Sequence, residues 1–262
     1  MVGAALRGME NLGQGRTVLG LVTSIPEEVA LEFLDSRVER STTLVFNPER
    51  RAIRRVELIR FDGHEIKRSE GRPAVDETVD AAEMLRLTVE SDGLAIPGWD
   101  AGIDHWITRV RCVAEWCPER NLPAYDPDDL AVVRAEVLGG ATRLSEVQRD
   151  AVGEIVRNAL NWEDRQFVER MAPERISLPG GGTMRIEYRE GEQPCGRARI
   201  QQLFGMEETP AVAAGRVRVL LEILAPNQRP VQRTNDLASF WARTYPELRK
   251  ELRRRYPKHE WP

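Results

Sequence analysis

The chain has 262 residues, of which 41% are apolar and 31% charged, with a formal net charge of −4 at neutral pH. This length predicts one large domain or two to three small ones, and charges of both signs argue against disorder throughout. The three cysteines argue against a disulfide framework and favour a reducing cytoplasm. We expect neither a membrane span nor a signal peptide, because no apolar run is long enough and the first residues lack a basic start.

Residues 1–73 predict a small β module behind a short lead-in. The glycine-rich residues 1–15 indicate a loose lead-in, and Pro26 opens a short helix that Ser24 caps. Strands are predicted at residues 17–22, 42–46 and 52–61, the last two joined by a turn at Asn47-Pro48. The last strand and its turn carry several arginines, Arg50, Arg51, Arg54, Arg55 and Arg60. These arginines either contact phosphates or solvate an exposed sheet face.

Residues 74–172 predict a helical region. Helices are expected at residues 75–89 and 100–116, from Asp126, from Ser145 to Leu160, and at residues 162–171. The helix at residues 100–116 has the clearest apolar stripe, and its other side carries a second stripe, His105, Arg109, Cys112 and Trp116. Packing within one domain is the preferred interpretation of that second stripe, and contact with another domain is the alternative.

Residues 173–262 predict a small α/β unit. Strands are expected at residues 175–178, 183–188, 216–224 and 230–233, with the third in the centre of the sheet. Gly180-Gly181-Gly182 predicts a flexible turn between the first two strands. A short helix is expected at residues 197–204, and two helices at residues 235–244 and 246–255 end the chain.

Several kinds of catalytic site find no support in the sequence. A P-loop needs a Gly-Lys-Ser/Thr run, and none of the three lysines follows a glycine. Asp76-Glu77 follows a proline-containing linker and predicts a helix start rather than a magnesium-binding motif. Cys112 and Cys117 are about 140° apart around a helix, which argues against one metal site. The few histidines and the lack of a Gly-x-Ser-x-Gly motif argue against a hydrolase triad.

The last 38 residues, from Ala225 to Pro262, contain nine basic and four acidic residues, so this end is about +5 on an acidic chain. In the last helix, Leu248, Leu252 and Tyr256 form an apolar stripe, and Arg249, Lys250, Arg253 and Arg254 cover the outer side. Two interpretations remain open. This end is either a helix pair that clamps the body of the protein, or a surface for nucleic acid or a partner domain.

Short motifs of this end resemble the C-terminal end of the HrpB-type DEAH-box ATP-dependent RNA helicases of bacteria. They are Arg229-Pro-Val-Gln, Asp236-Leu-Ala-Ser-Phe-Trp and Tyr256-Pro-Lys-His-Glu-Trp-Pro, preceded by Gln202-Leu-Phe-Gly, Thr209-Pro and Gly215-Arg-Val. The resemblance is specific from about Pro173 to Pro262 and looser from Arg16 to Pro173. The motor of that family would lie before Met1.

The resemblance implies an α+β fold with an oligonucleotide-binding-type (OB-like) β module at residues 1–73, a helical region at 74–172 and an α/β unit at 173–262. It implies an accessory region that binds RNA or single-stranded nucleic acid and supports a helicase motor. ATP and magnesium would then act only in the motor. The expected contact residues are Arg54, Arg60, Arg243, Arg249, Arg253, Lys258 and Trp261. One alternative is a protein–protein module that docks onto a separately encoded motor or another partner through the His105/Trp116 face. The other is an inert remnant of a truncated gene.

Overall fold

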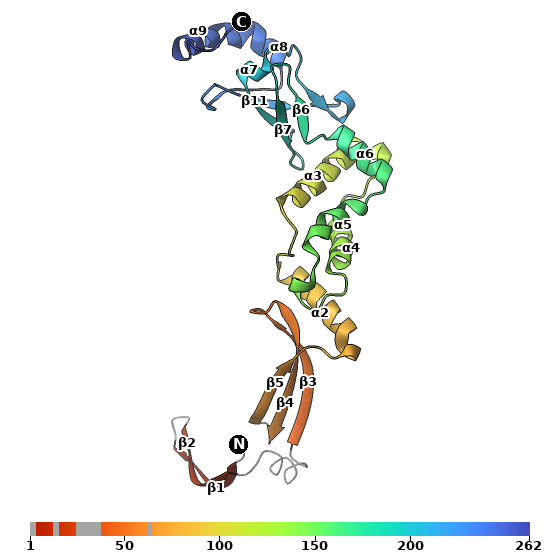
Figure 1. Ribbon diagram of the computed structural model, residues 1–262, viewed down its shortest axis with the longest axis vertical. Helices are drawn as coiled ribbons and strands as arrows, with labels where there is room; N and C mark the ends of the chain where they lie inside the picture. Colours follow the sequence, from red (N-terminus) through yellow and green to blue (C-terminus); the bar gives the residue numbers. More distant parts are fainter. Residues whose placement is uncertain (1–3, 13–15, 25–37, 62–63) are drawn as a thin grey trace. The chain divides into compact units, whose positions relative to one another are not determined.

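The computed structural model describes residues 4–12, 16–24, 38–61 and 64–262 and divides the chain into two compact units (Figure 1). Unit 1 comprises residues 1–93 and 140–146, and unit 2 comprises residues 94–139 and 147–262. Helices and sheets occur together, so the predicted α+β class is confirmed. The units divide the chain differently from the three predicted parts, because the predicted helical region contributes to both.

The described residues of unit 1 form two separate antiparallel sheets. One pairs β1 with β2, and the other has the order β3-β4-β5. The strands are β1 (Ala4–Leu12), β2 (Arg16–Ser24), β3 (Val38–Asn47), β4 (Ala52–Phe61) and β5 (His64–Gly71). The OB-like form of this module therefore stays a prediction. The prediction of a loose lead-in at residues 1–15 was wrong for the described residues 4–12, because β1 pairs with β2 along its length. The helix predicted from Pro26 lies outside the described residues.

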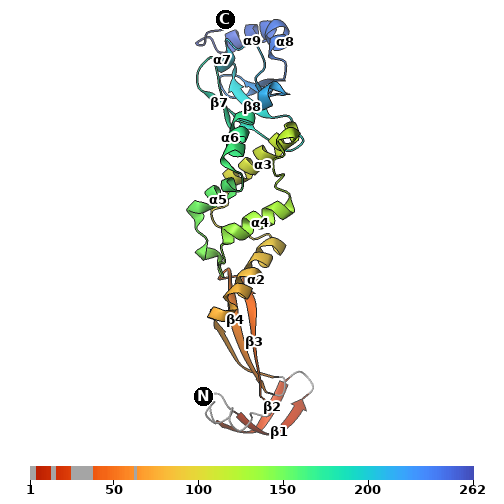
Figure 2. The same cartoon turned by 90° about the vertical axis from the view of Figure 1, so that its right-hand side faces the viewer.

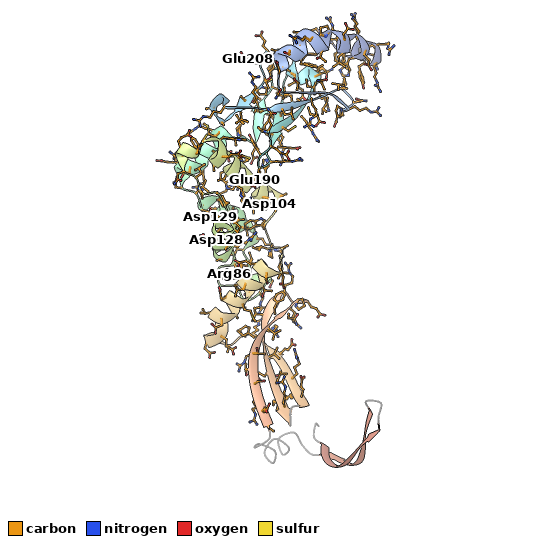
Figure 3. All side chains as sticks on the ribbon, turned by 180° about the vertical axis from the view of Figure 1, so that it is seen from behind. Arg86, Asp104, Asp128, Asp129, Glu190 and Glu208 are labelled. Carbon is orange, nitrogen blue, oxygen red and sulfur yellow. The ribbon has the colours of Figure 1, made fainter. Side chains whose placement is uncertain are left out.

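The core of unit 1 lies between the three-stranded sheet and helix α2 (Thr78–Ser91), which a short turn, η2 (Val75–Glu77), precedes. Ile53 and Val56 of β4 and Ala81, Leu85 and Val89 of α2 are buried. Arg86, labelled in Figure 3, lies on α2 and pairs with Glu83 and Glu90 on the same helix. The segment of residues 140–146 adds to this unit because the amide of Ile53 donates to the carbonyl of Thr142 at 2.8 Å.

Unit 2 begins with a set of helices: α3 (Ala101–Trp116), α4 (Pro127–Leu138), α5 (Val152–Asn158) and α6 (Trp162–Met171). Asp100 and Asp126 cap α3 and α4 by accepting hydrogen bonds from backbone amides, and both helices begin where the sequence predicted. Ser145 was expected to cap a helix that runs to Leu160. It lies instead within the short turn η4 (Leu144–Glu146), and α5 begins only at Val152.

Helix α3 is buried on two sides within unit 2. Ile103, Val110 and Val113 form the predicted apolar face, and Arg109 on the other side is 0% exposed. The Nε of Arg109 donates to the carbonyl of Ala172 at 2.7 Å. Its guanidinium also pairs with Glu169 at 2.5 Å and Glu174 at 3.0 Å. The preferred interpretation of the second stripe as packing within one domain is thus confirmed.

A five-stranded sheet with the order β12-β11-β8-β7-β6 forms the rest of the unit (Figure 2). Its strands are β6 (Arg175–Ser177), β7 (Thr183–Glu187), β8 (Cys195–Arg199), β11 (Leu220–Leu224) and β12 (Pro230–Thr234). A small second pair is formed by β9 (Ala211–Val212) and β10 (Val217–Arg218). Strand β11 lies inside the sheet, as predicted. The helix expected at residues 197–204 begins as β8 and becomes helical only in α7 (Ile200–Leu203).

Candidate nucleic-acid interface

The basic end of the chain is one continuous helical segment rather than the two helices predicted. It runs through α8 (Leu237–Ser239), a π turn labelled η7 (Phe240–Thr244) and α9 (Tyr245–Arg255). Pro246 explains the π turn, because proline lacks an amide hydrogen and its ring crowds the carbonyl four residues earlier. The amide of Tyr245 donates to the carbonyl of Phe240 instead. The helix thus passes the proline without breaking.

Aromatic and aliphatic side chains hold this segment against the rest of unit 2. Leu237, Phe240, Tyr245 and Leu252 are all buried. The ring of Trp241 lies 5.0 Å from that of Tyr245, and its indole N–H donates to the carbonyl of Met206 at 2.7 Å. Trp241 is therefore a packing residue, as its spacing indicated. Burial of this face fixes which side of α9 points to solvent.

Trp261 belongs to the same aromatic cluster and is 7% exposed. Its ring packs edge-on against Phe204, with centroids 6.5 Å apart, and its indole N–H donates to the carbonyl of Tyr256 at 3.1 Å. The hydroxyl of Tyr245 donates to the carbonyl of Pro262, which fastens the chain end. A base cannot stack on a ring that is already covered, so the prediction of Trp261 as a contact residue does not fit its burial.

The solvent side of this segment carries four of the predicted basic residues. Arg243, Arg249, Arg253 and Lys258 are exposed, and within the described part of the chain none of them has an ion-pair partner. Arg249 and Arg253 lie one helical turn apart on α9. Lys250 pairs with Glu247 at 2.8 Å, whereas the described residues show no ion pair for Glu251. The four residues thus form an exposed basic surface without ion pairs among the described residues, although the charge of Arg243 helps to lower the pKa of Asp236.

Two features of the fold are consistent with this arrangement. Arg253, Arg254 and Arg255 occupy the last turn of α9, where positive charge interacts favourably with the helix dipole. Asp236 caps the start of α8, and hydrogen bonds from the backbone and side chain of Ser239 lower the pKa of its carboxyl. The helix dipole explains part of the basic charge at this end, but it does not account for Arg249 or Arg243.

The predicted contact residues of unit 1, Arg54 and Arg60, have a different environment. Both lie on β4 and are half-buried, on the same side of the strand as the buried Val56. A terminal nitrogen of Arg54 donates to the carbonyl of Glu70 at 3.4 Å. Arg60 aligns with Glu39 on β3 and Glu65 on β5. These arginines therefore lie beside acceptors and acids of their own sheet, and they are less available than those of α9.

Two sequence segments weighed as nucleotide or magnesium sites have structural roles. Gly180-Gly181-Gly182 forms the hairpin turn between β6 and β7, where the amide of Gly181 donates to the carbonyl of Leu178. Gly181 and Gly182 both have a positive φ, which glycine adopts readily. Glu77 accepts a hydrogen bond from the amide of Ala74 at 2.8 Å, so Asp76-Glu77 begins a helical segment, as predicted.

Outside the basic end, the residues considered as a docking face or as metal ligands also have structural roles within unit 2. Tyr188 packs against His105 and Trp116 of α3, and the thiol of Cys112 lies 3.7 Å from the carbonyl of Arg189. The His105/Trp116 face is thus largely covered within unit 2. Burial raises the pKa of the Cys112 thiol to about 11. The described residues contain no cluster of metal-ligating side chains, and none of their helices could cross a membrane.

Sequence reasoning missed a second group of basic side chains, on the open face of the five-stranded sheet. They are Arg175, Arg185, Arg197, Arg199 and Arg233. Alternation of exposed and buried residues in β7 and β8 is the local signal for them, visible as Arg-x-Arg at Arg197 and Arg199. Their alignment across strands depends on register, which the sequence does not display.

Comparison with known proteins supports the resemblance of the sequence motifs. Residues 134–262 match the family model described as ATP-dependent helicase C-terminal. The chain is 35% identical over 195 residues to the ATP-dependent RNA helicase HrpB of Escherichia coli strain K12, covering 73% of this chain and 24% of that protein. This chain thus spans about a quarter of that relative's length.

Two solved structures of E. coli HrpB are also similar to this chain, each at 27% sequence identity. One, described as a DExH-box NTPase, has a TM-score of 0.68 and covers 96% of this chain and 32% of its own. The other, described as a DEAH/RHA helicase, has a TM-score of 0.61 and covers 94% of this chain and 30% of its own. The likeness extends over both units.

Proposed function

We propose that this chain is a C-terminal region of an HrpB-type DEAH-box helicase and that it binds single-stranded RNA as an accessory part of such a helicase. The observation that carries the proposal is the exposed basic surface of α9. Arg249 and Arg253 project from a helix whose opposite side is fixed in the core, and the described residues offer them no acidic partner.

Arginine suits this role because its planar guanidinium donates several hydrogen bonds to phosphate oxygens and keeps its charge at all relevant pH values. Each phosphate that such a residue neutralises releases a condensed counterion, so affinity falls as salt rises. Trp261 is buried, and the half-buried Trp241 packs against Phe204, Phe240 and Tyr245, so the proposal assigns no stacking role to either ring. The proposed surface therefore recognises the RNA backbone rather than particular bases.

The proposal assigns the catalytic step to a helicase motor and not to the residues of this chain. In the proposal, ATP and magnesium are bound by the motor, and this chain contributes RNA affinity in the cytoplasm. Consistent with this, the glycine run at residues 180–182 is a hairpin turn, whereas a P-loop leads into a helix.

Fluorescence anisotropy of a labelled oligouridine at about 50 and 200 mM salt tests the proposal. The wild-type chain is compared with the double variant Arg249→Ala/Arg253→Ala. We expect weaker binding by the double variant and a salt dependence that is shallower by about 1.4, because each single-strand phosphate contact contributes about 0.7 to the slope. The matched control is Arg149→Ala/Arg170→Ala, which removes the same charge from exposed positions elsewhere in unit 2.

The control variant should bind like the wild type. If the control weakens binding as much as the α9 variant does, net charge rather than the α9 surface governs affinity. If the wild-type chain does not bind RNA at low salt, the proposal is wrong. Docking onto another protein then becomes the leading function, because the exposed arginines of α9 would remain without a ligand.

A further inference from the structure

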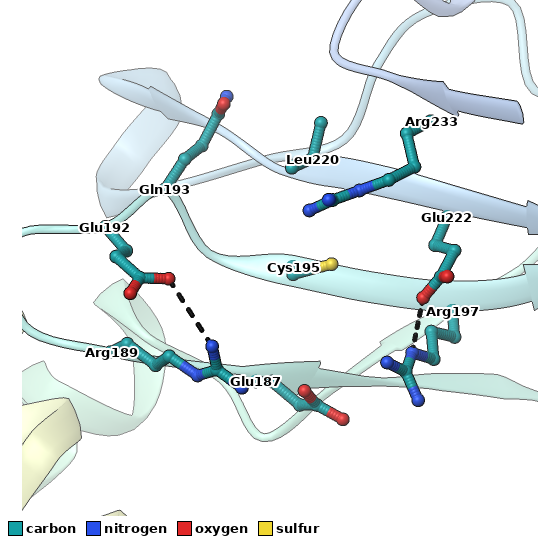
Figure 4. A pocket seen from close by; sticks show the side chains of 9 residues that line it. All are labelled: Glu187, Arg189, Glu192, Gln193, Cys195, Arg197, Leu220, Glu222 and Arg233. Carbon is teal, nitrogen blue, oxygen red and sulfur yellow. Dashed lines mark ion pairs between the residues drawn. The ribbon is translucent and has the colours of Figure 1, made fainter.

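The five-stranded sheet of unit 2 has one covered face and one open face. Met184, Ile186 and Ala198 are buried on the covered face, together with Leu221 and Ile223. The residues that alternate with them point the other way, and they are mostly charged or polar. Figure 4 shows part of this open face, with side chains from β7, β8, β11 and β12 on the same side of the sheet.

Strand register aligns arginines across the open face. Arg175 on β6 lies directly opposite Arg185 on β7, and the pairing of β7 with β8 continues this line to Arg197. Glu222 on β11 is opposite Arg197, and Arg233 on β12 is opposite Glu222. We call Arg175, Arg185, Arg197 and Arg233 the arginine row. Adjacent strands are 4.7–4.9 Å apart, so the row spans roughly 19 Å.

The row is only partly neutralised by the protein. Arg197 pairs with Glu222 at 2.5 Å, and Arg175 donates to the hydroxyl of Thr183 at 3.2 Å. Among the described residues, neither Arg185 nor Arg233 has an ion-pair partner. Like charges directly opposite each other destabilise a sheet, and three adjacent strands here carry arginine at aligned positions. A bound polyanion would remove this repulsion.

A shallow pocket of about 410 Å³ lies at one end of the face (Figure 4). Its charged lining is balanced, because Arg189, Arg197 and Arg233 are matched by three glutamates, Glu187, Glu192 and Glu222. The Arg233 side chain extends over the sheet beside Leu220 and Cys195. Glu192 lies beside Arg189 at 3.6 Å, whereas Glu222 and Glu187 lie on the side of Arg197 and raise its pKa. Within the arginine row, the positive charge without an ion pair among the described residues is therefore that of Arg175, Arg185 and Arg233.

We propose that the open face of this sheet is a second RNA-binding surface, on which the arginine row contacts the phosphate backbone of one single strand that crosses β6, β7, β8, β11 and β12. This inference rests on the proposed RNA-binding function and assigns it a site separate from α9. Four of the five strands place an arginine on this line, and only β11 interrupts it, with Glu222, so the row suits the phosphates of one strand. None of the described residues that point from the strands to this face is aromatic, so binding should be independent of base identity.

The test is made in the full chain and replaces the three arginines of the row other than Arg197, which is paired with Glu222. The triple variant is Arg175→Gln/Arg185→Gln/Arg233→Gln, and binding of a labelled oligouridine is measured by anisotropy at about 50 and 200 mM salt. We expect weaker binding and a salt slope that is shallower by about 2, as three single-strand phosphate contacts imply. A labelled oligoadenosine should bind to each protein with an affinity similar to that of oligouridine.

The control is Arg72→Gln/Arg149→Gln/Arg170→Gln, which removes the same charge from exposed positions away from the row. Circular dichroism verifies folding, and the row variant should melt at the same temperature as the wild type or higher, because it removes like-charge repulsion. If the row variant binds like the wild type while the α9 variant does not, the second surface is refuted and the α9 site stands. If the wild type does not bind RNA, both proposals fail.

Discussion

Arg109 shows how one side chain connects several parts of unit 2. Its guanidinium is fully buried and reaches a backbone carbonyl beyond α6 as well as two carboxylates. Its partners Glu169 and Glu174 are about half-exposed, with side-chain exposures of 47% and 55%. Water can therefore solvate these acids if Arg109 is removed, whereas the carbonyl of Ala172 would lose its partner inside the core.

Replacing Arg109 by alanine should lower the free energy of unfolding of unit 2 by about 2–4 kcal/mol, from the cavity and the unpaired carbonyl. Arg109→Lys should lower the free energy of unfolding by less than the alanine variant does, because the positive charge remains. It should still lower it, because lysine lacks the planar guanidinium that contacts several acceptors at once. Urea denaturation followed by tryptophan fluorescence measures both variants. An alanine variant as stable as the wild type would mean that the buried arginine contributes no net stability.

Local sequence signals predicted some of these residue roles and missed others. The spacing of His105, Arg109 and Cys112 identified a second face of α3, and packing within one domain was the correct interpretation. The burial of Trp261 could not be predicted, because a tryptophan in a basic tail has the same sequence context whether it is exposed or packed. Its burial depends on Phe204, a residue far away in the chain.

At the scale of elements, the fastening of α9 determines how its arginines are presented. The helix is held along its inner side by Tyr245 and Leu252 and at its end by Trp261, which folds back onto Phe204. The π turn before Pro246 sets the rotation of α9 relative to α8. The basic surface thus depends on packing rather than on the helix alone.

Trp261→Ala should lower the stability of unit 2 by about 2–4 kcal/mol, because a buried ring and one hydrogen bond are lost. RNA affinity should stay close to the wild-type value under conditions where the variant is folded, since the ring faces the core. Urea denaturation and anisotropy on the same preparation distinguish the two effects. Weaker RNA binding with unchanged stability would instead support the original expectation that Trp261 contacts a base.

Elements whose signals lie within their own residues could be predicted better than elements that depend on distant partners, for a physical reason. Asp100 and Asp126 signal helix starts through contacts within a few residues, so α3 and α4 were placed correctly. Strands β1 and β8 gain their hydrogen bonds from other strands, and their composition alone resembled a loop and a helix. The arginine row depends on the same pairing, which is why it emerged only with the register.

At the scale of the whole molecule, the two units have separate cores and different spectroscopic signals. All six tryptophans belong to unit 2, namely Trp99, Trp106, Trp116, Trp162, Trp241 and Trp261. Tryptophan emission therefore reports on unit 2, whereas far-UV circular dichroism reports on both units. The RNA-binding surfaces proposed here, on α9 and on the arginine row, also lie in unit 2.

Leu85→Ala tests whether unit 1 can be destabilised separately. Leu85 is 0% exposed in the core of unit 1, so the variant should lose about 2–5 kcal/mol in that unit. We expect an earlier transition in circular dichroism, an unchanged midpoint of tryptophan emission and unchanged RNA affinity below that transition. Leu221→Ala, at a 0% exposed position in unit 2, is the control that should shift the emission. If Leu85→Ala also shifts the emission midpoint, the two units unfold as one, and RNA binding by unit 2 depends on the fold of unit 1.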